Sequence, residues 1–325
     1  MPRIAARAAA LFIAFAAPAL AAEDSIAIPP GVATHADGRA PIDALYRKYL
    51  SLIGRGWKAE VVVQSEPAGT TQALPVVALL SPAQGPAIWI LAGVHGEEPA
   101  GPNAIASTID DIARLGAERP LVLMPLLNPQ GYARNWRYLN VPTYSPEVEG
   151  QSVGDSSHLL PSAEDEAKAR APAASSPEAD AITAFILRRQ ADYPTVISVD
   201  LHEDNLIDEG YVYSQGVAGA KEELAITAVN VLRENGVPIK MSGKTRFDEP
   251  VERGIVGPVT DGSIDELMSA HSIVLGGAAK PGPRATTVLV LETPAAALPL
   301  GKRIAAHAAL LRLLSTYLMT PPDGF

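Results

Sequence analysis

Short apolar runs alternate with longer segments of helical periodicity along this 325-residue chain. Runs of strand length lie at residues 58–64, 73–80, 87–94, 121–127, 195–201 and 286–291. Most of them lack alternating polar positions, which is typical of strands buried on both faces of a parallel sheet. The turn-forming residues 66–69 separate the first two runs, so we expect these to form an opening pair of strands.

Helices are expected at residues 99–115, 177–190, 218–235 and 300–319. Ser176 and Pro177 suit the N-cap and first position of the second helix, and Gly236 suits the end of the third. Strands that alternate with helices predict an α/β fold with a mixed, mostly parallel, twisted sheet and helices on both faces. A single domain over residues 22–325 accounts for the pattern, and we find no internal repeat.

Two segments fall outside this pattern. Residues 1–21 combine two arginines, an apolar region and a small-residue cleavage site, which is typical of a cleaved signal peptide. No later apolar run reaches the ~20 residues that a membrane-spanning helix needs. We therefore expect a periplasmic or secreted protein without a permanent membrane span. Residues 142–176 are rich in proline, serine, alanine and acids, and predict a long loop.

Composition narrows the classes of function. The formal net charge is −10 and no basic cluster is present, which argues against nucleic acid and anionic membrane surfaces as partners. The chain has no cysteine, so it has no disulfides, no thiolate zinc ligands and no cysteine nucleophile.

A candidate metal site follows from two strand ends. His95 comes directly after the strand predicted at 87–94, and Glu98 precedes the next predicted helix. Ligands bind outside the carboxyl ends of the strands in open α/β sheets, and nitrogen plus oxygen ligation suits zinc. A catalytic zinc needs a third protein ligand, and His202, directly after the strand at 195–201, can supply it. We expect one Zn²⁺ per chain, with one position left open for water.

Several motifs stand along the chain in a recognisable order: His95-x-x-Glu98, an Asn-Pro-Gln-Gly turn at 128–131, Arg-Asn-Trp-Arg at 134–137, His202, Gly-Ser-Ile-Asp at 262–265, and Glu292. This order resembles the zinc carboxypeptidase family, including its succinylglutamate desuccinylase and aspartoacylase relatives, over roughly residues 85–295. The resemblance implies a carboxypeptidase-like fold with His95, Glu98 and His202 as zinc ligands. It also implies that Glu292 is the general base and that Arg137 polarises the scissile carbonyl.

The chemistry of amide hydrolysis fits these roles. Zinc lowers the pKa of bound water to about 7, and Glu292 can take the proton and pass it to the leaving amine. A guanidinium such as Arg137 can share the oxyanion of the tetrahedral intermediate with zinc. Removing one such donor typically costs ~2.7 to 4 kcal/mol of barrier.

One segment departs from the family pattern. The family binds the substrate's terminal carboxylate with an Asp-x-Asn-Arg sequence, which corresponds best to residues 155–158. Asp155 is kept and is expected to orient His95. Ser157 and His158 replace the asparagine and arginine, and an imidazole cannot reproduce a bidentate guanidinium clamp.

The altered clamp leaves the substrate contacts open. His158 and Arg134 are candidate substrate-binding residues, and Arg246 is a further cation that could perform the clamp's task. Tyr211 and Tyr213 alternate on a predicted strand, where packing is their expected role, although they could line the cleft.

Three functions remain open. The first is an exported zinc metallopeptidase that acts on peptides, including peptidoglycan stem peptides. The second is an amidohydrolase that removes an acyl group from an amino acid, as in the desuccinylase branch, although export argues against intracellular metabolites as substrates. The third is a non-catalytic binding protein, against which Glu292 argues, because zinc ligation alone does not need that residue.

Overall fold

The computed structural model describes residues 26–27, 31–66, 72–139 and 154–317. The predicted signal peptide lies outside the described residues, as does the part of the predicted long loop from 142 to 153. In the described segments, no helix combines the length and the apolar character that crossing a membrane requires.

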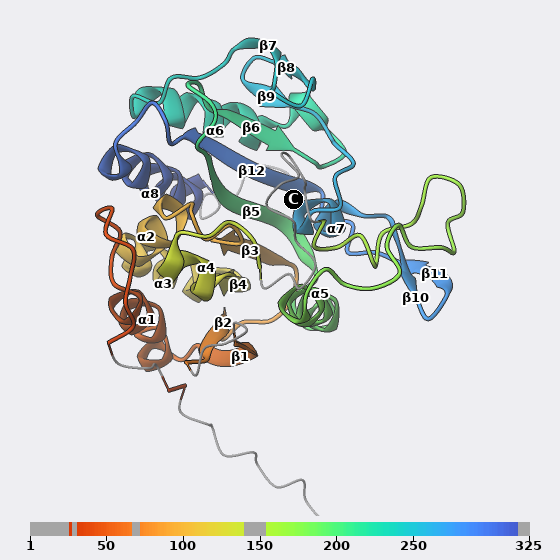
Figure 1. The fold of residues 1–325 in the computed structure, drawn as a ribbon, viewed down its shortest axis with the longest axis horizontal. Helices are drawn as coiled ribbons and strands as arrows, with labels where there is room; N and C mark the ends of the chain where they lie inside the picture. Colours follow the sequence, from red (N-terminus) through yellow and green to blue (C-terminus); the bar gives the residue numbers. More distant parts are fainter. Residues whose placement is uncertain (1–25, 28–30, 67–71, 140–153, 318–325) are drawn as a thin grey trace, which may run out of the picture.

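A mixed sheet forms the centre of the molecule (Figure 1). Within the described residues it has ten strands, which are, in spatial order, β1 (Lys58–Ser65), β2 (Leu74–Leu80), β4 (Leu121–Met124), β3 (Ala87–Ala92), β5 (Thr195–Asp204), β12 (Thr287–Pro294), β6 (Tyr211–Ser214), β9 (Ile255–Val256), β8 (Pro250–Glu252) and β7 (Ser242–Lys244). The central strands β4, β3, β5 and β12 are parallel to one another, whereas β1 and β2 on one side and β7 and β8 on the other pair antiparallel. Two further strands, β10 (Ser272–Leu275) and β11 (Ala278–Pro281), form a separate hairpin.

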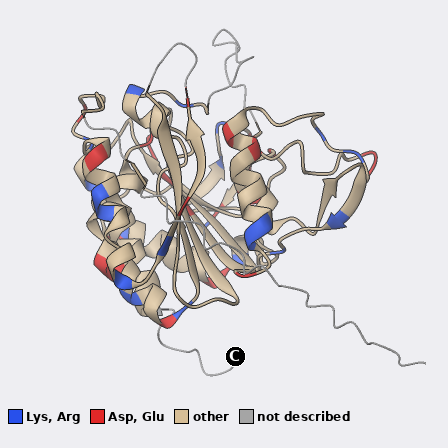
Figure 2. Ribbon diagram, turned by 90° about the horizontal axis from the view of Figure 1, so that it is seen from below, with Lys and Arg blue, Asp and Glu red and all other residues tan. Residues whose placement is uncertain are grey.

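Helices cover both faces of this sheet, as Figures 1 and 2 show. The described helices are α1 (Ile42–Leu50), α2 (Ala100–Ser107), α3 (Ile109–Glu118), α4 (Pro129–Arg134), α5 (Pro177–Arg189), α6 (Glu223–Glu234), α7 (Ile264–Ser269) and α8 (Leu300–Tyr317), with 3-10 turns at Ile53–Arg55 and Gly219–Lys221. The predicted α/β fold, with a mixed sheet between two helical layers, is therefore confirmed.

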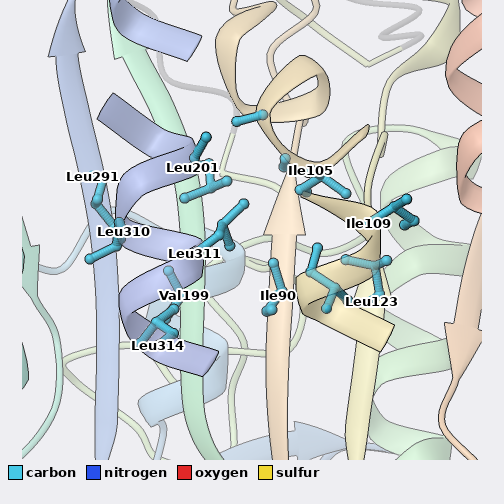
Figure 3. Packing of buried hydrophobic residues seen from close by; sticks show 14 of the residues in the cluster. Ile90, Ile105, Ile109, Leu123, Val199, Leu201, Leu291, Leu310, Leu311 and Leu314 are labelled. Atoms are coloured by element: carbon cyan, nitrogen blue, oxygen red, sulfur yellow. The ribbon is translucent and has the colours of Figure 1, made fainter. Parts of the chain in front are cut away.

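The side chains of β3 explain why its sequence is apolar at every position. Ile90 belongs to a hydrophobic cluster with residues of α2, α3 and α8, and Figure 3 shows Ile90, Ile105 and Leu311 among the packed side chains of this cluster. Its neighbours Trp89 and Leu91 belong to a second cluster on the other face, with residues of α5 and α7. Since successive side chains of a strand point to opposite faces, a strand between two helical layers must be apolar throughout.

The helix predicted at 99–115 is interrupted. It forms two helices, α2 and α3, with Thr108 at the junction, where φ is −113° and ψ is 18°. The Thr108 hydroxyl donates to the carbonyl of Ala104 at 2.8 Å, and its backbone carbonyl accepts the first hydrogen bonds of α3. Side-chain bonding of this kind competes with helix continuation, which the apolar periodicity alone does not reveal.

The predicted turn at 128–131 is instead the start of a short helix, α4. Asn128 is its N-cap, with Oδ1 accepting from the Gly131 amide at 2.8 Å, and Pro129 takes the first position. The prediction for α5 is confirmed, because Ser176 caps it through the Ala179 amide and Pro177 begins it. Residues 154–176 form no described helix or strand of the sheet, as expected for the loop.

Candidate active site

Three predicted metal ligands converge at one edge of the sheet. His95 follows β3 and Glu98 precedes α2, while His202 lies near the carboxyl end of β5, the parallel neighbour of β3. His95 Nδ1 is 2.8 Å from Glu98 Oε1, and His202 Nδ1 is 3.0 Å from Glu98 Oε2. The two Nδ1 atoms are 3.2 Å apart. Parallel pairing therefore brings together residues that are more than a hundred positions apart in sequence.

This donor set fits a zinc ion. The site combines two imidazoles with a buried carboxylate, and the ligand atoms of the three residues lie within 4.8 Å of one another. Burial alone would raise the pKa of the Glu98 carboxyl, but the imidazoles of His95 and His202 hold it below its usual range. An ionised carboxylate between two imidazoles is the arrangement that a divalent cation requires of its ligands.

The outer nitrogen of the His202 imidazole lies near a carboxylate that is not among the predicted site residues. Asp200 Oδ2 is 3.2 Å from His202 Nε2, and Asp265 belongs to the same buried group. Burial would lower the pKa of His202, but the Asp200 and Glu98 carboxylates raise it well above its usual value. The Asp-x-His spacing could have indicated this contact from the sequence, because residues two apart on a strand point to the same face.

Asp155 lines the same pocket, and its hydrogen-bond contact is with Ser175 Oγ at 3.5 Å rather than with His95, which it was expected to orient. Burial raises the pKa of Asp155 to about 7. Among the described residues, it is therefore Asp200, and not Asp155, whose carboxylate lies next to the outer nitrogen of a candidate ligand, namely His202.

Glu292 reaches the site from β12, the central strand that pairs with β5. It lies in β12 directly beside His202 in the parallel register, and it lines a cavity of about 550 Å³ with His95 and His202. Its Oε2 atom is buried and has no hydrogen-bond partner among the described residues. Burial raises the pKa of the Glu292 carboxyl to about 8. A buried carboxylate with a free oxygen beside a metal site is suited to proton transfer.

Arg137 also lines the cavity, on the side of the His95 loop. Its Nη1 donates to Glu97 Oε1 at 2.9 Å and to Glu98 Oε1 at 2.8 Å. The backbone here is packed so closely that a Cβ on Gly96 would lie 2.1 Å from the carbonyl carbon of Gly131. The glycine thus allows the segment with Arg137 to lie against the metal-binding loop. Glu97, which orients this guanidinium, was not among the predicted site residues.

The two predicted substrate-binding residues do not line this cavity. Arg134 is exposed at the end of α4, and its Nε donates to the Gln130 carbonyl at 3.2 Å. His158 faces α5, with Nε2 at 3.4 Å from Thr183 Oγ1 and 3.8 Å from Asp180 Oδ1. By contrast, Arg246 and Tyr213 do line the cavity.

Comparison with known proteins agrees with this arrangement. Residues 84–206 match the model of the succinylglutamate desuccinylase/aspartoacylase catalytic domain. This range contains the three candidate ligands and Arg137. This match, together with the fold of solved structures, confirms the resemblance to the zinc carboxypeptidase family and its succinylglutamate desuccinylase and aspartoacylase branch. Glu292 lies outside the matched range, so its assignment depends on its position in β12.

Solved structures share the carboxypeptidase-like fold. A candidate metallopeptidase from Shewanella baltica OS155 has 23% sequence identity and a TM-score of 0.65, over 85% of this chain and 92% of that one. A second from Shewanella amazonensis SB2B has 23% identity and a TM-score of 0.65, over 87% and 94%. A metallo-carboxypeptidase from Burkholderia cenocepacia has 14% identity and a TM-score of 0.51, over 84% and 70%. No curated protein matches the chain in sequence.

Proposed function

We propose that this protein is an exported zinc-dependent metallopeptidase that hydrolyses a peptide or other amide bond. The observation that carries the proposal is the convergence of His95 Nδ1, Glu98 and His202 Nδ1 beside Glu292 in one cavity. The matched catalytic domain and the carboxypeptidase-like fold support a metal-dependent hydrolase.

The proposed mechanism divides the reaction among these residues. His95, Glu98 and His202 would hold a zinc ion, and this ion would supply the Lewis acidity that activates water and polarises the carbonyl oxygen. The Glu292 carboxylate accepts a proton from the attacking water and delivers it to the leaving nitrogen. Arg137 directs a positive charge at the oxygen that becomes negative in the transition state. Glu97 and Glu98 fix the orientation of that guanidinium through its Nη1 atom.

The deacylase reaction is the second candidate. It is favoured by the match to the succinylglutamate desuccinylase/aspartoacylase domain and by the replacement of the family's clamp with Ser157 and His158. A non-catalytic binding protein is the third. The buried Glu292 carboxylate argues against it, because a free oxygen at this position costs stability and contributes nothing to metal ligation.

A hydrolysis panel tests these alternatives. The mature protein, loaded with zinc, is incubated with free and C-terminally amidated peptides, peptidoglycan stem peptides and N-acylated amino acids, and release of new amino groups is measured. Preferential cleavage of peptides supports the peptidase, and cleavage of acylated amino acids alone supports the deacylase. Zinc binding without any turnover across the panel would favour the binding protein. A secretion assay with residues 1–21 fused to a reporter tests the proposed export.

A further inference from the structure

Arg246 has no part in the mechanism above, although among the described residues it is one of two arginines that line the cavity. It lies in the turn between β7 and β8, far in sequence from the metal ligands. The other arginine, Arg137, already has its Nη1 bound by Glu97 and Glu98.

One edge of the Arg246 guanidinium is fixed by the protein. Its Nε donates to Asp204 Oδ2 at 3.0 Å, and its Cζ lies 4.3 Å from the centre of the Phe247 ring. Asp204 is itself buried, and its Oδ1 accepts from the Leu206 amide at 2.8 Å. The guanidinium is thus oriented before any ligand binds, which reduces the entropy lost on binding.

The other edge of this guanidinium is open. In the described part of the chain, neither terminal nitrogen of Arg246 donates a hydrogen bond, and 31% of the side chain is exposed. A planar fork with two free nitrogen donors matches the geometry of a carboxylate. In Arg170, by contrast, both Nη atoms donate to Glu266, so that guanidinium has no free fork.

The position of Asp204 sets how far Arg246 is from the reacting bond. Asp204 lies two residues beyond His202 on β5, so both side chains point to the same face of the strand. Two residues of strand span roughly 6.6 Å. The guanidinium is therefore anchored about two residues away from the metal ligand, along the cavity that a substrate would occupy.

We propose that Arg246 is a specificity-determining residue that binds a substrate carboxylate, in place of the clamp that is absent at His158. The inference rests on the proposed function, because it assumes that the substrate is cleaved beside His202. It assigns an anionic substrate group to the wall formed by the end of β5 and the β7–β8 turn.

A binding experiment tests this without requiring turnover. Glutarate and pentanoate have the same chain length, and each can reach the metal site through one carboxylate, but only glutarate has a second. Calorimetry on the zinc-loaded protein should give tighter binding of glutarate by roughly 10- to 100-fold, the range expected for a hydrogen bond between charged groups. Arg246→Gln should abolish this preference, while Arg246→Lys, which keeps the charge but not the fork, should retain part of it.

Arg253→Gln is the matched control, because it removes the same charge at a position that does not line the cavity. Arg253 is exposed and lies between β8 and β9. This variant should retain the full preference for glutarate. Circular dichroism and zinc content establish that each variant is folded and loaded. A zinc-loaded Arg246→Gln protein that keeps the glutarate preference, or a wild type that shows none, would overturn the proposal.

A kinetic experiment determines on which side of the scissile bond the substrate carboxylate bound by Arg246 lies. Matched pairs, Glu-Ala with Gln-Ala and Ala-Ala with its amide, differ in one carboxylate on either side of the scissile bond. Arg246→Gln should lower kcat/KM by at least tenfold for one carboxylate-bearing member and by less than twofold for its neutral partner. Equal losses for both members of each pair would contradict the inference. If the wild type cleaves no peptide, the proposed function fails, while the calorimetric result still decides the role of Arg246.

Discussion

Asp200 and His202 show how much of this candidate metal site depends on single side chains beyond the three proposed ligands. The Asp200 carboxylate is completely buried and lies 3.2 Å from the outer nitrogen of His202. A carboxylate in this position fixes the orientation of the imidazole and increases its basicity as a ligand. The metal affinity of the site should therefore depend on a residue that does not contact the ion.

Asp200→Asn should weaken zinc binding by about 10- to 100-fold, because the amide keeps the size of the side chain but removes its charge. Competition with a chromophoric chelator measures the affinity directly. Asp208→Asn, which removes the same charge at an exposed position in the loop after β5, should leave zinc affinity unchanged. Equal zinc affinity in wild type and Asp200→Asn would show that the contact with His202 has no role in metal binding.

Glu292 is the residue on which the chemical proposal depends most. Glu292→Gln should lower kcat by ~10² to 10⁴ while zinc content stays unchanged, because the amide retains the shape but cannot accept the proton. Since the base acts only when ionised, wild-type kcat/KM should fall as pH decreases below the pKa of Glu292. That pKa is about 8 without a cation, and a bound dication would lower it. Loss of zinc from the variant would instead identify Glu292 as a ligand.

At the level of secondary-structure elements, the short helix α4 links the fold to the position of Arg137. Its N-cap, Asn128, accepts from the Gly131 amide and also donates from Nδ2 to the carbonyls of Arg137 and Tyr138, at 3.2 and 2.9 Å. One side chain therefore caps the helix and holds the chain that carries the proposed oxyanion donor.

Asn128→Ala should lower both stability and activity. Loss of the cap alone costs about 1 kcal/mol of unfolding free energy, and kcat should also fall because the segment with Arg137 loses two hydrogen bonds. Ser176→Ala is the control, since Ser176 caps α5 and should cost a similar amount of stability without changing kcat. Denaturant unfolding and steady-state kinetics of both variants measure the two effects. Unchanged kcat in Asn128→Ala would separate this cap from catalysis.

At the level of the whole molecule, the packing of α8 against the sheet contains a buried histidine. His307 is completely buried, and its Nε2 lies 3.0 Å from Thr293 Oγ1 on β12. Burial lowers the pKa of His307 to about 3. The folded protein thus keeps this imidazole neutral over a pH range in which an unfolded chain would protonate it.

Stability should consequently decrease as pH falls from about 6.5 towards 3, because only the unfolded state takes up the proton in this window. His307→Gln should be less sensitive to acid. Between pH 7 and pH 5, wild type should lose roughly 2 kcal/mol more of unfolding free energy than the variant, from the pKa difference over that interval. Urea unfolding of the zinc-free proteins at several pH values measures this. Parallel pH profiles would show that His307 is protonated in the folded state.

The sequence by itself determined the elements whose residues carry a strong local signal. The apolar runs of β2, β3 and β12 identify strands buried on both faces, because only that environment requires every position to be apolar. Ser176 and Pro177 fix the start of α5 through capping chemistry that depends on neighbouring residues alone. The candidate ligands could be recognised for the same reason, since each comes close to the end of a predictable strand.

Only the tertiary structure decided which polar side chains meet at those strand ends. Thr108 interrupts a periodic helix through a side-chain bond, and His158 turns towards α5 and away from the cavity. Arg246 enters the cavity because the β7–β8 turn brings it to Asp204. These contacts depend on strand register and on the path of connecting loops, which bring together residues tens of positions apart. Local residue preferences carry no information about such distances, so the candidate ligands could be selected from the sequence, whereas most of the contacts around them could not.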